Sequence, residues 1–262
     1  MLNEGRHVKY LTAVHTDAGI KKMINQDSLF LEIAVADCGR VVLAVICDGL
    51  GGLSKGEVAS AVLVRAFADW FHRVFPGLLY GGLTPDAVEK SWMQLICDTS
   101  EKITDYGRKL HIKLGSTVTA LLLAEETYFI IQVGDSRAYL LDKSLRQLTV
   151  DQTFVQREVE MGRMTSEEAV RSPRRNVLLQ CVGAGSVPKP DFYVGRYGGG
   201  QVFMLCSDGF CQMILPEEFY EMLNPRELVT EKHMKENAVY LTRLNRERHV
   251  TDNISVILIR VC

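Results

Sequence analysis

The sequence lacks a long hydrophobic run, a secretory leader pattern and an excess of charge of one sign. No apolar stretch approaches the ~18 residues that a membrane-spanning helix needs, and the N-terminus, with Glu4, Arg6 and Lys9, has no apolar centre typical of a signal peptide. The 30 basic and 32 acidic residues leave a net charge of −2, which gives no indication of general nucleic-acid binding. These absences predict a cytoplasmic globular protein that binds neither a membrane nor nucleic acid.

Cysteine and histidine patterns of common metal sites are also absent. The seven cysteines include no Cys-x-x-Cys pair, which argues against a zinc ribbon or a thioredoxin-like site. Several cysteines, such as Cys47 and Cys206, lie inside apolar runs, where a free thiol behaves as a small core side chain. The six histidines show no ligand spacing, so we expect them at the surface or satisfied within the core.

The composition is that of an ordinary globular domain, and we expect one domain over residues 1–262. Apolar and alternating runs predict strands over 8–14, 28–36, 40–47, 116–124, 127–133, 138–141, 191–196, 202–206 and 254–261. Helical periodicity predicts helices over 54–75, 85–110, 216–223 and 226–245, and residues 151–180 are polar and helical. We expect hairpins that pair 28–36 with 40–47 and 191–196 with 202–206. Hairpins together with paired helices indicate an α+β fold of antiparallel sheets.

Four aspartates lie at the ends of apolar strands. Asp48 and Asp208 each end an apolar run and precede a glycine, Asp135 follows residues 129–134, and Asp252 precedes the last strand. An unpaired carboxylate in such a place is costly, so a cation must compensate it. Oxygen ligands without histidine or cysteine favour Mg²⁺ or Mn²⁺ over zinc. A single Asp-Gly pair is more often just a turn, but four such sites weaken that interpretation.

Short motifs containing these aspartates follow one another along the chain. They are Asp17-Ala18-Gly19 with Asn25-Gln26-Asp27, Asp48-Gly49-Leu50-Gly51-Gly52, Gly115-Ser116-Thr117, Val133-Gly134-Asp135-Ser136-Arg137-Ala138-Tyr139, Asp151-Gln152-Thr153-Phe154-Val155, Ser207-Asp208-Gly209 and Thr251-Asp252-Asn253-Ile254-Ser255. In this order they resemble the metal-dependent Ser/Thr protein phosphatases of type 2C, specifically the compact bacterial members. The resemblance covers about residues 8–261. Each motif alone is weak, whereas the ordered set is highly specific.

The resemblance implies a four-layer αββα sandwich, in which two antiparallel sheets pack face to face between paired helices. It implies hydrolysis of phosphoserine and phosphothreonine in proteins by a water activated at a binuclear Mn²⁺ or Mg²⁺ centre. Phosphorylated proteins, and a Ser/Thr kinase whose signalling is reversed, are the implied partners. The sequence has no Cys-x₅-Arg loop, so cysteine-based phosphatase chemistry is a poor alternative.

The family pattern also assigns roles to individual residues. Asp48 would bridge both ions, and Asp208 and Asp252 would complete the first. The Gly49 carbonyl would join Asp48 on the second ion, with waters at its remaining positions. Asp135 together with Asp208 would hold a third, weaker ion.

Other positions of the pattern are less regular. Asp27 would orient a metal-bound water. Lys22 stands where the family usually has an arginine, so we assign it to the substrate phosphate, with a point charge instead of a planar fork. Gln26 replaces a metal-binding glutamate of many eukaryotic members, and Leu50 replaces a histidine that is thought to be their general acid.

Two other interpretations stay open from the residues alone. The chain could be an inactive phosphoprotein-binding scaffold of the same fold, an idea that only Lys22 supports because the metal-binding aspartates are retained. It could also be a phosphohydrolase of small metabolites.

The resemblance further implies a flap at about residues 151–180. The basic run at 171–175 is either a solvated surface or a grip for acidic phosphoproteins.

Overall fold

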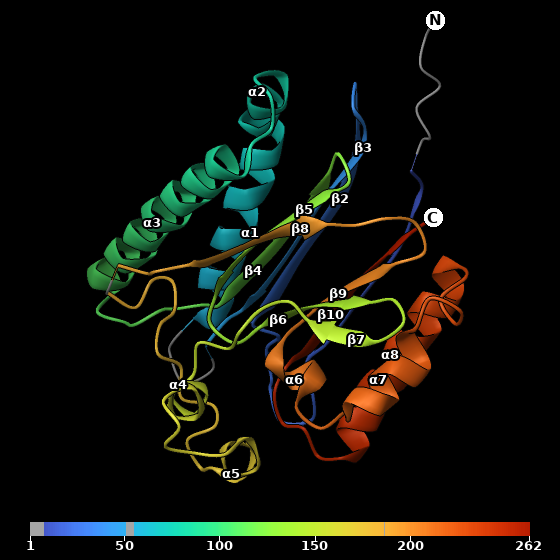
Figure 1. The fold of residues 1–262 in the computed structure, drawn as a ribbon. Helices are drawn as coiled ribbons and strands as arrows, with labels where there is room; N and C mark the ends of the chain where they lie inside the picture. Colours follow the sequence, from blue (N-terminus) through green and yellow to red (C-terminus); the bar gives the residue numbers. More distant parts are fainter. Residues whose placement is uncertain (1–7, 51–54, 186) are drawn as a thin grey trace, which may run out of the picture.

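The computed structural model describes residues 8–50, 55–185 and 187–262. Two antiparallel sheets of five strands each pack face to face, and helices cover the outer side of each sheet (Figure 1). The predicted α+β class and the four-layer αββα sandwich are therefore confirmed. Apolar cores fill the space between the sheets and the space beneath each helical layer.

The strands of each sheet come from distant parts of the chain. The first sheet contains, in spatial order, β1 (Tyr10–Asp17), β10 (Ile254–Val261), β9 (Val202–Cys206), β6 (Arg137–Leu141) and β7 (Leu145–Gln147). The second sheet contains β2 (Asp27–Ala36), β3 (Gly39–Asp48), β4 (Val118–Ala124), β5 (Thr127–Val133) and β8 (Asp191–Arg196). Every neighbouring pair is antiparallel.

Strand β3 shows why some strands are apolar at every position. Successive side chains on a strand point to opposite faces. Val42 and Ile46 pack between the two sheets, whereas Leu43 and Val45 pack beneath the helices. Both faces of β3 are therefore covered, so no polar position interrupts the run that ends at Asp48.

Helices form the two outer layers. The second sheet is covered by α1 (Gly56–Arg73), the short α2 (Phe75–Tyr80) and α3 (Pro85–Leu110). The first sheet is covered by α6 (Asp208–Cys211), α7 (Pro216–Leu223) and α8 (Glu231–Glu247). Helix α3 begins where predicted, because the Thr84 hydroxyl accepts a hydrogen bond from the Ala87 amide at 3.3 Å and Pro85 suits the first turn. Within the described ranges, no helix is both long and apolar enough to cross a membrane.

Residues 151–180 project from the sandwich next to the strand ends (Figure 1). The expected helical character is limited to α4 (Phe154–Glu160) and α5 (Ser166–Arg171), with irregular backbone around them. Helix α5 has no buried residue, and the Thr165 hydroxyl and the Glu168 carboxylate form a capping box at its start. Local hydrogen bonds therefore define α5 more than a core does.

One predicted hairpin is wrong. Strand β8 pairs with β5 in the second sheet, whereas β9 pairs with β10 and β6 in the first. The Gly198–Gly200 turn therefore carries the chain from one sheet to the other instead of closing a hairpin. Every residue of β9 is buried, so it needs a partner on each side, whereas β8 is a partly exposed edge strand. The predicted 28–36 and 40–47 hairpin forms, as β2 and β3.

Candidate active site

The five aspartates proposed for catalysis and metal binding gather at one end of the sandwich. Asp27 begins β2 and pairs in register with Asp48, the last residue of β3. Asp208 lies two residues after β9, the strand that pairs with β10, and Asp252 lies two residues before β10 itself. Asp135 lies in the turn from β5 to β6, which crosses between the sheets. The strand order thus brings together side chains that are up to 225 residues apart in the chain, from Asp27 to Asp252.

Glycines beside these aspartates allow their backbones to approach closely. A Cβ atom on Gly49 would collide with the carbonyl groups of Gly56 and Gln26. A Cβ atom on Gly209 would collide with the Asn253 carbonyl. The Gly49 amide also donates to the Gln26 carbonyl at 3.1 Å. Only glycine fits these contacts, so the two Asp-Gly pairs are more than surface turns.

Burial and mutual repulsion oppose the charged forms of these carboxylates. Burial raises the pKa of the Asp48 carboxyl well above its usual range, and the surrounding carboxylates raise it further. Burial similarly raises the pKa of Asp135 well above its usual range. It raises the pKa of Asp27 to about 7 and, with help from Asp252, that of Asp208 to about 6. Such a cluster becomes stable in its charged form when cations neutralise it.

The donor atoms fit hydrated divalent cations. One buried oxygen of Asp27 (Oδ1) and one of Asp208 (Oδ1) have no hydrogen-bond partner, although buried carboxylate oxygens normally have one. Among the described residues, no group of three or more acidic, histidine or cysteine side chains lies close enough together to hold a metal ion without further ligands. Hard oxygen donors in an open arrangement suit Mg²⁺ or Mn²⁺, which retain water ligands.

Lys22 places a positive charge at the edge of this cluster. Its ammonium lies 3.1 Å from Oδ1 of Asp252, and both side chains are partly exposed. The predicted phosphate-binding lysine therefore lies beside a predicted metal ligand. The structure thus brings together Lys22 and all five aspartates, while Gly51 and Gly52 of the predicted glycine-rich motif lie outside the described residues.

Serine side chains hold the Asp27 carboxylate in place. The Ser255 hydroxyl donates to Oδ2 of Asp27 at 2.6 Å, and the Ser255 amide donates to the Ser207 hydroxyl at 3.0 Å. Sequence reasoning listed both serines in motifs and assigned no role to either. The signal in the sequence was their position: Ser207 directly precedes Asp208, and Ser255 lies two residues after Asn253.

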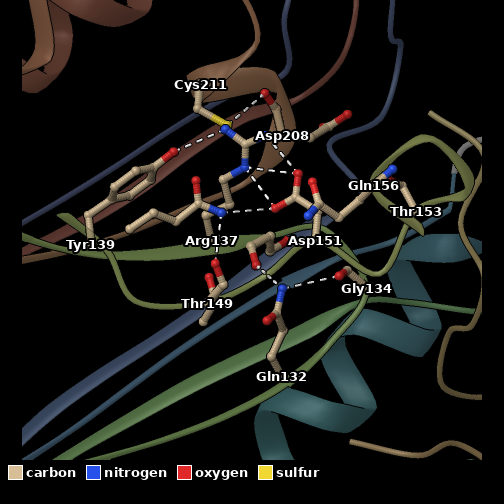
Figure 2. A network of polar contacts seen from close by, with 12 residues as sticks. Gln132, Gly134, Arg137, Tyr139, Thr149, Asp151, Thr153, Gln156, Asp208 and Cys211 are labelled. Atoms are coloured by element: carbon tan, nitrogen blue, oxygen red, sulfur yellow. Dashed lines mark hydrogen bonds and ion pairs between the residues drawn. The ribbon is translucent and has the colours of Figure 1, made fainter. Parts of the chain in front are cut away.

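A partly buried ion pair adjoins Asp208 (Figure 2), and its arginine lies two residues after Asp135 in the chain. The Arg137 guanidinium binds both carboxylate oxygens of Asp151, with Nε–Oδ1 at 2.9 Å and Nη2–Oδ2 at 2.7 Å. Its Nη1 donates to the Tyr139 hydroxyl at 3.0 Å. Figure 2 shows Cys211, on the turn of helix that Asp208 begins, beside the same guanidinium. Sequence reasoning missed this ion pair, which links the Asp135 turn to the start of the 151–180 segment.

Gln152 makes a second link between these two segments. Its side-chain Oε1 accepts a hydrogen bond from the Gly134 backbone amide at 2.8 Å, and its backbone amide donates to the Gly134 carbonyl at 2.9 Å. Its Nε2 donates to Asp191 at 2.7 Å. The Gln152 carbonyl accepts from the Leu179 amide, where the 151–180 segment returns to the sandwich. Gly134, the residue before Asp135, is thus bonded to the base of that segment.

Comparison with known proteins identifies the family. The model of the protein phosphatase 2C family matches residues 16–254. The chain belongs to the protein phosphatase 2C family. It is 31% identical over 221 residues to the serine/threonine phosphatase stp of Listeria monocytogenes serotype 4b, and this match covers 83% of each of the two chains. It is 32% identical over 247 residues to the phosphatase PstP of Mycobacterium tuberculosis, a match that covers 94% of this chain and 44% of PstP.

Solved structures of protein phosphatase 2C type have the same fold. A serine/threonine phosphatase of S. agalactiae superposes with a TM-score of 0.82 at 27% identity, and the match covers 97% of this chain and 100% of that one. The catalytic domain of PstP in complex with two manganese ions superposes with a TM-score of 0.77 at 28% identity, over 97% and 98% of the chains. The present chain is a metal-dependent protein serine/threonine phosphatase of this family.

Proposed function

We propose that this phosphatase hydrolyses phosphoserine and phosphothreonine at the aspartate cluster, with two Mn²⁺ or Mg²⁺ ions bound there. Asp48 would contact both ions, Asp208 and Asp252 would complete one ligand set, and the Gly49 carbonyl would contribute to the other. When bound, such ions supply a water of lowered pKa and neutralise phosphoryl charge. The observation that carries the proposal is the convergence of buried carboxylates with unpartnered oxygens on Asp27 and Asp208.

Two further residues would act on water and substrate. Asp27 keeps one oxygen bonded to Ser255 and the other without a partner, so it can accept a hydrogen bond from the attacking water and orient it. Lys22 would contact the substrate phosphate from its place beside Asp252. An ammonium gives a point charge without the paired geometry of a guanidinium, so this contact orients phosphate less strictly than arginine would.

The 151–180 segment would serve as a flap within one phosphatase domain that spans residues 1–262. Asp135 and Asp208 would hold a third ion near its base, where Gln152 and Arg137 link the segment to the Asp135 turn. On this flap, the Arg174 guanidinium lies over the Phe154 ring at 4.9 Å. The exposed arginines of the run 171–175 would attract acidic phosphoproteins by charge.

The biological partners follow from this chemistry. A phosphatase of phosphoserine and phosphothreonine opposes a Ser/Thr kinase, so we place a kinase and its substrates among the partners. We place the enzyme in the cytoplasm, where a reducing environment suits its seven free cysteines.

Manganese-dependent dephosphorylation of a phosphothreonine peptide tests the proposal, with p-nitrophenyl phosphate as a small-substrate comparison. Activity that requires Mn²⁺ and is lost with a chelator is the expected result. Isothermal titration should show about two core ions per chain. Activity that persists after chelation would contradict the metal mechanism. Hydrolysis of small phosphomonoesters without any hydrolysis of phosphopeptides would indicate a metabolite phosphohydrolase instead.

A further inference from the structure

The loop of residues 18–26 carries Lys22 from β1 to β2 and is called here the lysine loop. Hydrophobic packing does not hold this loop, because Ile20, Met23 and Ile24 are exposed, Met23 by 99% of its surface. A lysine ammonium at the end of a flexible four-carbon stem is poorly defined unless its backbone is fixed. The anchoring of the loop therefore bears on where the Lys22 ammonium lies.

A single buried side chain binds both ends of the lysine loop. The amide of Asn253 donates through Nδ2 to the carbonyls of Ala18, at 2.9 Å, and Ile24, at 3.4 Å. Its Oδ1 accepts from the backbone amide of Gln26 at 2.9 Å. Both donors and the acceptor of the side chain are thus used on this loop. Asn253 is fully buried, so the loss of these bonds would leave polar groups unpaired inside the protein.

The same residue is rigidly joined to the predicted metal ligand. The backbone amide of Asn253 donates to Oδ1 of Asp252 at 2.9 Å, and this oxygen is also the one that Lys22 contacts. Two glycines pack against this dipeptide so closely that a Cβ atom on Gly19 would collide with the Asp252 carbonyl and one on Gly209 with that of Asn253. The Asp252–Asn253 backbone is therefore fixed relative to both the Asp208 turn and the lysine loop.

We propose that Asn253 is a positioning residue, which places the Lys22 ammonium beside the metal ligands so that it can contact the substrate phosphate. The inference rests on the proposed phosphate role of Lys22. It adds a direct physical link between the metal site and the phosphate contact. Within one dipeptide, the Asp252 carboxylate is the proposed metal ligand, and the Asn253 side chain fixes the lysine loop.

A double-mutant cycle between Asn253→Ala and Lys22→Ala tests the inference. Each single variant should raise KM for a phosphothreonine peptide, and the inhibition constant of inorganic phosphate, by about tenfold, the lower end of the effect of one lost hydrogen bond to a charged group. The double variant should be no worse than Lys22→Ala alone, because Asn253 acts through Lys22. At saturating Mn²⁺, kcat should change little, and Mn²⁺ affinity by isothermal titration should stay near the wild-type value.

A matched control separates this role from a general loss of stability. Asn237→Ala removes an asparagine whose Nδ2 donates to the Met222 carbonyl at 2.7 Å, between α7 and α8 and outside the active site. This variant should lose thermal stability with no change in KM or phosphate inhibition. If Asn253→Ala does not fold, Asn253→Ser, which is smaller and neutral but supplies one hydroxyl in place of the amide, replaces it in the same cycle.

The other outcomes overturn the inference in distinguishable ways. Additive effects of the two substitutions, or an Asn253 variant that loses Mn²⁺ affinity and kcat while KM is unchanged, would show that Asn253 acts on Asp252 and not on Lys22. An unchanged KM in Lys22→Ala would remove the phosphate role of Lys22 and the inference with it. Wild-type protein without Mn²⁺-dependent activity would instead contradict the proposed function itself.

Discussion

The aspartate cluster and the 151–180 segment adjoin each other but are built in opposite ways. The cluster lies at the ends of strands such as β3, in which every residue from Val41 to Asp48 is buried. The segment consists of helices of seven and six residues, and α5 buries none of them. Strand pairing and the apolar cores fix the aspartate cluster, whereas helix caps and surface ion pairs define the 151–180 segment. We therefore expect chemistry to depend on the cluster and substrate choice to depend on the segment, and five predictions test that division.

The largest effect is expected at the cluster. Asp208→Asn or Asp252→Asn removes the charge of a proposed metal ligand, so kcat should fall by about a hundredfold or more, since even partners of metal ligands are worth about 10–100-fold. Phosphopeptide and p-nitrophenyl phosphate should be affected alike. Isothermal titration that shows unchanged Mn²⁺ binding in both variants would contradict the assignment.

Asp135 connects the two regions and should have an intermediate effect. Asp135→Ala should reduce turnover about tenfold, the scale of a lost partner of a metal site, and leave the two core ions bound. A crystal structure of the variant grown with Mn²⁺ measures the occupancy directly. Loss of the ion at Asp48 in that structure would show that Asp135 belongs to the binuclear centre.

Metal removal should make the stability of the cluster depend on pH. The pKa values of Asp27, about 7, and Asp208, about 6, lie above the value of about 4 for a carboxyl in the unfolded chain. The folded chain therefore binds more protons, and the free energy of unfolding falls as pH rises from about 4 to about 7. In chelator, Tm should be lower at pH 7.5 than at pH 5.5, and Mn²⁺ should restore it more at pH 7.5. The same pH dependence of Tm with and without Mn²⁺ would show that these carboxyl groups do not interact with the ions.

Lys22 should change substrate binding more than turnover. Lys22→Arg should lower KM for small phosphomonoesters several-fold, or by about 1 kcal/mol, because a guanidinium gives a second charge-assisted hydrogen bond. kcat should stay nearly constant if the contact is equal in the ground and transition states. Lys22→Ala should raise KM with the ions still bound. If Lys22→Arg and Lys22→Ala have the same KM and the same phosphate inhibition, the ions alone bind phosphate.

The smallest effect is expected on the 151–180 segment. Arg174 is exposed and lies over Phe154, so Arg174→Ala should leave p-nitrophenyl phosphate hydrolysis unchanged. Its KM for an acidic phosphoprotein should rise about twofold to fivefold, the worth of one exposed charge contact. Arg196→Ala, which removes a surface pair with Glu126 on the β5–β8 side, is the control. Equal effects on both substrates would mean that the 151–180 segment supports the chemistry and that the division between the regions does not hold.

Much of this architecture could be read from local patterns. The bounds of α3, β5, β8, β9, α7 and β10 agree with the predicted ranges, because periodicity and capping residues act over a few neighbours. The ordered motifs sufficed for the family and the αββα fold. The aspartates could be found because a carboxylate at the end of an apolar strand is unusual in any context.

Tertiary structure alone decided which segments meet. An apolar run predicts a strand but not its partner, since pairing depends on packing across the sheet. For this reason the short Gly198–Gly200 turn suggested a hairpin, whereas burial of β9 on both faces required β10 and β6. The bonds of Asn253 to the lysine loop likewise join residues more than 200 positions apart. Sequence by itself thus determined the chemistry available and the local elements. Long-range packing, in which each contact depends on all the others, decided that Lys22 contacts Asp252 and that Gln152 bonds the 151–180 segment to the Asp135 turn.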